Sequence, residues 1–407
     1  MGGASSRDQQ SSTSPFFDQK ELQGLRSAYE EGGLEKAASL IQKKIKDLEG
    51  IELNIAVTGE SGTGKSSFIN AIRGLQNVDE GAAKVGNIET TMEPTPYRHP
   101  TLPNVCFWDL PGVGTAKFTA DKYLAKMNFK KYVFFIIIIH ARFKENDAKL
   151  AGEIKRLGKD FYLVRSKIDN DLDSMKMGGM KFNEEEELGK IRDDCVSKLK
   201  EAGLSSPAIF LISSFKINQF DFPALQETIA NNLNDIKKHA FMLSLPNTTV
   251  KIIDQKKNAL KSKIWMLATI SGAVGLVPIP GLSFSCDIGI LVTAIIQFRQ
   301  YLGLDDASLQ RLANIARKPV GDLKAVVKTP LVGEINQDFV VRMLMGSVFV
   351  GISVAEAVFD FIPVFGSLFG AASSFGITYK LLNNVLDELT ENAQRVVEAA
   401  FGTAPKH

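Results

Sequence analysis

A glycine-rich loop that carries one lysine is the clearest chemical signal in the sequence. It reads GESGTGKSS, follows a short apolar run over 51–58 and precedes a stretch with helical spacing. Its glycines let successive backbone N–H groups point at phosphates, while Lys65 reaches the β- and γ-phosphates and the Ser66 hydroxyl binds Mg²⁺. The expected phosphate-binding residues are Gly59, Glu60, Ser61, Gly62, Thr63, Gly64, Lys65, Ser66 and Ser67.

A second motif, Asp109-Leu110-Pro111-Gly112, ends the strand-like run 104–108. The Asp109 carboxylate is expected to hold Mg²⁺ through water, and the Gly112 amide to contact a γ-phosphate. Asp109 and Ser66 therefore belong to one predicted Mg²⁺ site.

A third motif selects the base. The strand-like run 160–165 ends in Ser166-Lys167-Ile168-Asp169, a variant of the N/T-K-x-D motif. The Asp169 carboxylate can accept hydrogen bonds from both the ring N1–H and the exocyclic amine of guanine, a donor pair that adenine lacks. Another run, 208–212, ends in Ser213 and Ser214, where a loop amide is expected to contact guanine O6. The predicted nucleotides are therefore GTP and GDP rather than ATP.

A mostly parallel sheet must position these motifs. Strand-like runs alternate with helical segments from about Ile51 to Leu233, which predicts a doubly wound α/β domain with ligand loops at the strand ends. The run 132–139 is too short to span a membrane and is expected to be the central buried strand. The acidic run 184–187 is expected to lie in a solvated loop.

Composition excludes several classes of protein. The chain has 407 residues with 48 Lys plus Arg against 46 Asp plus Glu, so its net charge of +2 gives no reason to expect nucleic acid as the partner. Its three cysteines are far apart and form no CxxC pair, which argues against a disulfide framework or a zinc site and favours a reducing compartment. The four histidines show no metal-ligand spacing.

The polar start of the chain lacks the apolar run of a signal peptide. Gly2 and Ser6 match the M-G-x-x-x-[ST] pattern of N-myristoylation, although a flexible polar tail fits residues 1–15 equally well. A single myristoyl chain binds membranes only marginally, so a stable anchor needs a second signal. Residues 16–50 have helical spacing that is interrupted at Gly32-Gly33.

The C-terminal part, 236–407, has helical spacing broken by prolines and is predicted to be a mostly α-helical second domain. Two stretches, 264–298 and 343–379, are unusually apolar, and three interpretations stay open for them: core helices, membrane-inserting hairpins or an oligomer interface. Four lysines just before the first stretch fit an anionic lipid surface or, equally, a solvated helix face. They are Lys256, Lys257, Lys261 and Lys263.

The quoted motifs, together with VGNIETTMEPTPYRHP, ARFKENDA and YLGLDDASLQRLA, resemble the interferon-inducible, immunity-related GTPases. The resemblance covers the whole predicted GTPase domain and part of the helical region. It implies a Ras-like P-loop GTPase domain, 51–235, carried on a mostly α-helical domain built from both chain ends. It also implies GTP-dependent self-assembly and action in cell-autonomous innate immunity on membranes that enclose intracellular pathogens.

Catalysis is expected to need help from outside the monomer. Val113 follows the D-x-x-G motif where Ras-like proteins keep a water-orienting glutamine, and valine cannot orient water. Thr91 is the expected switch threonine for Mg²⁺ and the γ-phosphate, with Thr90 as the competing choice. By resemblance, Glu89 matches a switch glutamate that family members use on dimerisation, although an exposed loop glutamate is the alternative. The predicted catalytic residues are thus Lys65, Glu89 and Thr91. Arg98 and Arg142 are candidates for trans-acting arginines, and the alternative, which is favoured, is that each is a structural or surface residue.

The combined prediction is a cytoplasmic, peripherally membrane-associated GTPase on an endomembrane or vacuole, with Mg²⁺ as cofactor. Its expected partners are other copies of itself, intracellular membranes and related GTPases. Two alternatives stay open: a signalling switch that does not assemble and needs an external activating protein, and an integral membrane protein that uses nucleotide only structurally.

Overall fold

The computed structural model describes residue 17 and the ranges 19–86, 93–111, 127–141, 143–204, 208–274, 288–349 and 374–402. The chain divides into two compact units. The helical unit comprises Met1–Leu48, Lys257–Arg299 and Pro330–Leu389, and the sheet unit comprises Glu49–Lys256, Gln300–Thr329 and Thr390–His407. The domain limits predicted from the sequence, at 51–235 and 236–407, stay a prediction.

A six-stranded mixed sheet organises the sheet unit, in the order β2-β3-β1-β4-β5-β6. Its strands are β1 (Leu53–Thr58), β2 (Thr95–Arg98), β3 (Val105–Asp109), β4 (Phe134–Ile139), β5 (Asp160–Arg165) and β6 (Ile209–Leu211). β2 pairs antiparallel with β3, whereas the other neighbours are parallel. Because the parallel strands end at one edge, the three predicted ligand loops leave the sheet at that edge.

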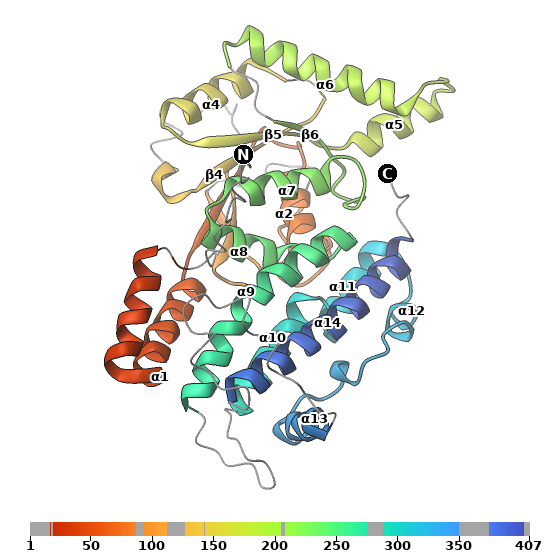
Figure 1. Ribbon diagram of the computed structural model, residues 1–407. Helices are drawn as coiled ribbons and strands as arrows, with labels where there is room; N and C mark the ends of the chain where they lie inside the picture. Colours follow the sequence, from red (N-terminus) through yellow and green to blue (C-terminus); the bar gives the residue numbers. More distant parts are fainter. Residues whose placement is uncertain are drawn as a thin grey trace, which may run out of the picture. The chain divides into compact units, whose positions relative to one another are not determined.

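Helices cover both faces of this sheet (Figure 1). One face packs against α2 (Lys65–Ile72), α7 (Phe222–Asn232) and α8 (Asp235–Ser244), and the other against α4 (Glu145–Arg156), α5 (Ile168–Met177) and α6 (Glu184–Glu201). Within β4, Ile136 and Ile138 point to the first face while Ile137 and Ile139 point to the second. This two-sided burial explains the uninterrupted apolar run, since each buried isoleucine contributes about 1.5–3 kcal/mol.

The acidic run 184–187 is helical, so the prediction of a loop there is wrong. It forms the first turn of α6, and the Asn183 side chain caps the helix by accepting from the backbone N–H groups of Glu185 and Glu186. Carboxylates are favourable at this end because the helix dipole is positive there.

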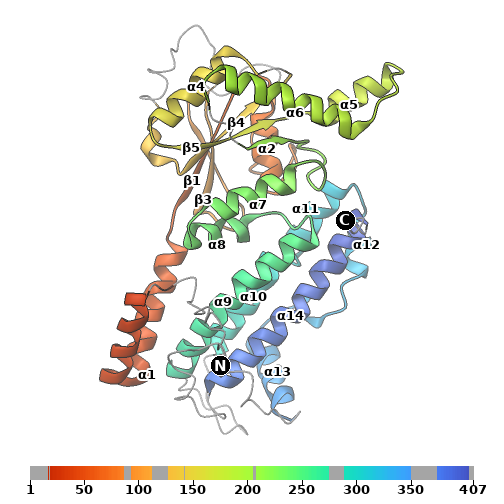
Figure 2. The same cartoon turned by 45° about the horizontal axis from the view of Figure 1, so that its top comes forward.

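Residues from both ends of the chain build the helical unit. Helix α1 (Gln19–Glu49) contains non-helical backbone at Gly32 and Gly33, which confirms the predicted interruption. Leu25 and Ile41 of α1 share a core with Met266 of α9 (Val250–Val274) and Phe375 of α14 (Ser374–Phe401). Helices α10 (Ile288–Tyr301) and α13 (Gln337–Phe349) complete this part of the chain, while α11 (Asp306–Ala316) and α12 (Val320–Ala325) belong to the sheet unit (Figure 2).

The described parts of the two apolar stretches are helical, and several of their apolar side chains are fully buried. Met266 in α9, Leu291 and Ile295 in α10, and Leu344 in α13 are fully buried. None of the described helices is long and apolar enough to cross a membrane. For these parts, burial in a helical core is therefore favoured; residues 275–287 and 350–373 lie outside the described chain.

Two of the four lysines expected on the surface are buried. Lys256 is 2% exposed and Lys263 is 7% exposed, while Lys257 forms a 2.7 Å ion pair with Asp387. Among the four, only Lys261 is exposed. The interpretation of these residues as one lipid-facing or solvated stripe is therefore wrong.

Candidate nucleotide-binding site

The loop between β1 and α2 passes directly against β4. At Gly59 the backbone φ is +140°, and a Cβ placed there would lie 2.0 Å from the Ile138 carbonyl oxygen. Gly64, with φ +94°, is the N-cap of α2. Positive φ values at these two positions, and the close approach of Gly59 to β4, favour glycine over any residue with a Cβ. The loop can therefore curl and present the N-terminus of α2 to a phosphate.

The Lys65 side chain folds back over this loop. Its Nζ donates to the backbone oxygens of Gly59 and Glu60 at 3.2 and 3.0 Å, and the residue is 8% exposed. The ammonium group is therefore held above the curled backbone, at the positive end of α2. A bound phosphate would meet the lysine and the helix N-terminus together.

Oxygen atoms from two loops meet beside the lysine. The Ser66 hydroxyl donates to Asp109 Oδ2 at 3.0 Å, and Asp109 is 1% exposed at the end of β3. A hydroxyl and a carboxylate are the hard oxygen donors that Mg²⁺ prefers. The residues present thus fit the predicted Mg²⁺ site.

The motif after β5 is bonded to the phosphate loop. Ser166 Oγ donates to the Thr63 carbonyl oxygen at 2.5 Å, and Lys167 Nζ donates to the Gly62 carbonyl oxygen at 2.8 Å. Lys167 has φ 61° and is the N-cap of α5, which places Asp169 in the first turn with 8% exposure. Ser166 and Lys167 therefore fix the position of the expected base reader relative to the phosphate loop.

Ser213 forms a turn rather than offering its side chain to a ligand. Its Oγ accepts from the backbone N–H groups of Phe215 and Lys216 at 3.1 and 3.2 Å, and the residue is fully buried. The neighbouring Ser214 is half-buried. Ile168 N–H donates to the Ile212 carbonyl oxygen at 3.2 Å, so this loop lies beside the S-K-x-D loop, as the guanine-contact prediction requires.

Three residues near the loop were not singled out by the sequence analysis. Lys144 forms an ion pair with Glu60 of the phosphate loop, and Asp147 accepts from the Lys144 backbone N–H at 3.0 Å. Burial raises the Asp147 pKa to about 6. His140 directly follows β4, and its pKa is lowered by burial and by the nearby Lys167 ammonium. Their position just after the end of β4 is the signal that could have identified them.

Several expected site residues lie outside the described chain. They are Gly2, Glu89, Thr90, Thr91, Gly112, Val113 and Arg142. Arg98 is described, and its Nη1 donates to the Pro103 carbonyl oxygen at 2.8 Å, so this guanidinium supports the turn between β2 and β3.

A phosphate loop after β1, an aspartate ending β3 and a guanine-type motif after β5 define a P-loop GTPase. The sequence model described as Interferon-inducible GTPase (IIGP) matches residues 18–400. The chain belongs to this family, which confirms the resemblance drawn from its motifs.

Individual relatives match most of the chain. The chain is 41% identical to Interferon-inducible GTPase 5 of Rattus norvegicus over 385 residues, covering 94% of this chain and 83% of that protein. It is 40% identical to T-cell-specific guanine nucleotide triphosphate-binding protein 2 of Mus musculus over 386 residues, covering 93% and 89%. Interferon-inducible GTPase 1 of Mus musculus is 41% identical over 318 residues, covering 78% and 77%. The chain is therefore a GTPase of this family.

Proposed function

We propose that this GTPase binds GTP with Mg²⁺, self-assembles in the GTP-bound form and hydrolyses GTP cooperatively. The observation that carries the nucleotide-binding part of this proposal is the convergence of Lys65, the Ser66–Asp109 pair and Asp169 on one edge of the sheet. Lys65 binds and orients the phosphates, Ser66 and Asp109 hold Mg²⁺, and Asp169 reads guanine. Bound Mg²⁺ supplies charge stabilisation to the transferring phosphoryl group.

The proposal of cooperative hydrolysis rests on the lack of a water-orienting glutamine after the D-x-x-G motif. Lys65 and Ser66 bind phosphate and metal, and the residue after the D-x-x-G motif is Val113. We assign the missing function to Glu89, with Thr91 completing the Mg²⁺ site, when two molecules associate. The biological setting we propose is defence at pathogen-containing vacuoles, which the interferon-inducible names of the relatives support.

Glu89→Ala is expected to separate assembly from hydrolysis. The variant keeps Lys65, Ser66 and Asp169, so it should bind GTP and assemble, while its turnover falls by roughly a hundredfold because water is no longer oriented. Light scattering with GTP should show assemblies that form and persist, whereas wild-type assemblies decay as GTP is consumed. Glu93→Ala, on the same segment and exposed, is the matched control. Glu89→Ala assemblies that decay at the wild-type rate would exclude Glu89 from catalysis.

Membrane association is proposed to depend on a Gly2 acyl chain and a second, weaker contact. The Gly2→Ala variant cannot be myristoylated, so it should float with liposomes less than the myristoylated wild type does. The two proteins should bind GDP with the same affinity. Because one myristoyl chain gives only reversible binding, the loss should be partial. The second contact should leave a measurable fraction of Gly2→Ala bound. Equal flotation of the two proteins would exclude the acyl chain as an anchor.

A further inference from the structure

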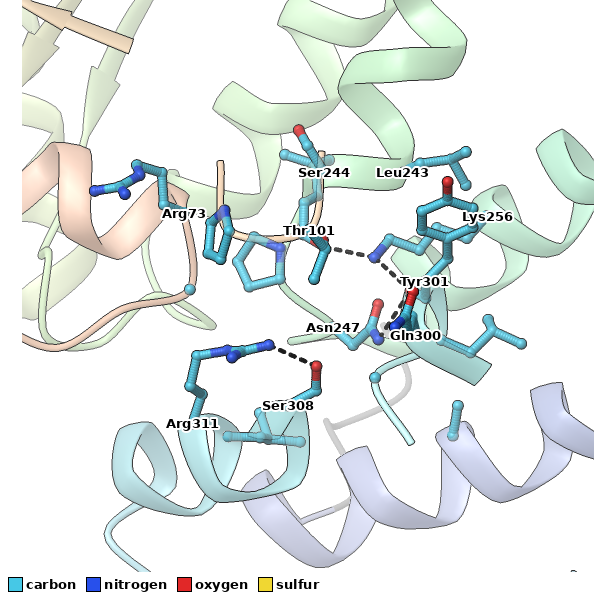
Figure 3. A pocket seen from close by; sticks show the side chains of 18 of the residues that line it. Arg73, Thr101, Leu243, Ser244, Asn247, Lys256, Gln300, Tyr301, Ser308 and Arg311 are labelled. Atoms are coloured by element: carbon cyan, nitrogen blue, oxygen red, sulfur yellow. Dashed lines mark hydrogen bonds between the residues drawn. The ribbon is translucent and has the colours of Figure 1, made fainter. Parts of the chain in front are cut away.

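A cavity within the sheet unit lies apart from the nucleotide site. It has a volume of about 60 Å³ and is lined by the turn after β2, the segments before α9 and after α10, and α11 (Figure 3). A single water needs roughly 10–15 Å³ by this measure, so there is room for about four waters or one tetrahedral oxyanion. Arg73, the residue after α2, lines it, whereas Lys65 begins α2 at the phosphate loop. An eight-residue helix spans about 12 Å, which separates the two sites.

A buried lysine extends into this cavity (Figure 3). Lys256 is 2% exposed, and its Nζ donates to the carbonyl oxygens of Leu245 and Tyr301 at 2.6 and 2.8 Å. An ammonium group has three N–H donors, so these two carbonyls satisfy two of them. Burial alone lowers the Lys256 pKa to about 7, with no contribution from a carboxylate.

His99 also lines the cavity, with basic side chains near it. His99 is 7% exposed, and burial together with the charges of Lys256, Arg73 and Arg311 lowers its pKa to about 3. Thr101 N–H donates to His99 Nδ1 at 3.3 Å. Burial is the largest cause of this lowered pKa, and the three neighbouring cations add to it, so His99 stays neutral beside the cavity.

Arg311 reaches the cavity from α11. Its Nη2 donates to the Ser308 hydroxyl at 2.7 Å, and both side chains point toward the space in front of Lys256 (Figure 3). Asn247 adds an amide, whose Nδ2 donates to the Tyr301 carbonyl oxygen at 3.4 Å. Hydroxyl, amide, guanidinium and ammonium groups thus converge on one small volume.

This concentration of positive charge lacks an acidic counterpart. Among the cavity-lining residues that the structure describes, none is Asp or Glu. Buried charges are normally paired, because an isolated charge loses its hydration without compensation. A bound anion would supply the counter-charge and accept charge-assisted hydrogen bonds.

We propose that this cavity is a binding site for a compact oxyanion, such as a phosphate group, held by Lys256, Arg311 and Ser308. The site is independent of the GTP phosphates, which bind at the other end of α2. The phosphate can be carried by a free ion or by a lipid headgroup, and both present the same tetrahedral oxyanion. Sulfate is the simplest probe, because it has this shape and keeps its charge between pH 6 and pH 8.

The test is calorimetric titration of sulfate into the full chain saturated with GDP and Mg²⁺, so that the phosphate loop is already filled. We expect one saturable site at constant ionic strength. Lys256→Met and Arg311→Gln should each weaken it about tenfold or more, as expected for loss of a hydrogen bond to a charged group. Lys251→Met, which removes an exposed lysine from the same helix as Lys256, should leave it unchanged.

Sulfate affinity should also depend on pH, being about tenfold tighter at pH 6 than at pH 8. Lys256 is the group facing the cavity that titrates in this interval, because His99 stays neutral and burial holds the Tyr301 pKa at about 12. The protonated fraction of Lys256, and with it the affinity, therefore falls as the pH rises.

Vesicles distinguish the two sources of phosphate. Competition with sulfate by phosphatidic acid in phosphatidylcholine vesicles supports a lipid headgroup, whereas competition by inorganic phosphate alone supports a free ion. No saturable sulfate binding to the wild type, or equal binding by wild type and Arg311→Gln, would overturn the proposal. Since the wild-type titration and Arg311→Gln suffice, the test does not depend on the folding of Lys256→Met.

Discussion

Lys65→Ala is expected to lower GTP turnover by roughly 10²–10³-fold, the loss typical of one preorganised donor at a transition state, and to abolish GTP-driven assembly. The Lys65 ammonium lies 3.2 and 3.0 Å from the Gly59 and Glu60 carbonyl oxygens, directly over the curled backbone. Alanine removes the positive side chain that the Gly59 and Glu60 carbonyl oxygens hold over the loop. Single-turnover hydrolysis with saturating Mg²⁺ and GTP measures the effect on chemistry.

Lys149→Ala is the matched control for this experiment. Lys149 is an exposed lysine that pairs with Glu145 on the surface of α4, so its loss should change turnover by less than twofold. Near-normal turnover by Lys65→Ala would contradict the role assigned to the loop.

Asp169→Asn is expected to transfer preference from guanine to xanthine nucleotides. In the proposed base site the Asp169 carboxylate accepts from two guanine N–H groups, whereas an asparagine amide would place a donor against the exocyclic amine. Two hydrogen bonds to a charged group are worth about 3–6 kcal/mol, so GDP should bind roughly 10²–10⁴-fold more weakly. Xanthine carries an oxygen where guanine has the amine, and that oxygen can accept from the new amide.

Competition of labelled GDP with unlabelled GDP and XDP measures this exchange of preference. Asp173→Asn, on the same helix but exposed, should leave both affinities unchanged. Unaltered GDP affinity in Asp169→Asn would remove Asp169 from the base site.

The sequence was sufficient to predict the sheet and its ligand loops, because these depend on local patterns. The β4 run is apolar on both faces, and Gly59 and Gly64 have the backbone conformations that the motif requires. The break at Gly32-Gly33 is likewise local. In each case, nearby residues determine the structure.

Features that depend on contacts between distant parts of the chain, or on ambiguous local signals, were not predicted. Lys256 was predicted to lie on the surface, but its ammonium group is buried and donates to the backbone carbonyl oxygens of Leu245 and Tyr301. Every residue has a backbone carbonyl, so residue types alone do not indicate such partners. Lys144 pairs with Glu60, 84 residues away. The helix at 184–187 was missed because its cap is a single asparagine, Asn183, which fits a loop equally well.

The most direct test of cooperative hydrolysis is the GTPase rate per molecule as a function of protein concentration, with and without liposomes. Val113 cannot orient the attacking water. If a second copy of the protein is needed for this step, the specific rate should rise over a hundredfold range of concentration and then saturate. Glu89→Ala should remain low throughout. A specific rate that stays flat across the range would contradict the account, and would assign hydrolysis to the isolated molecule.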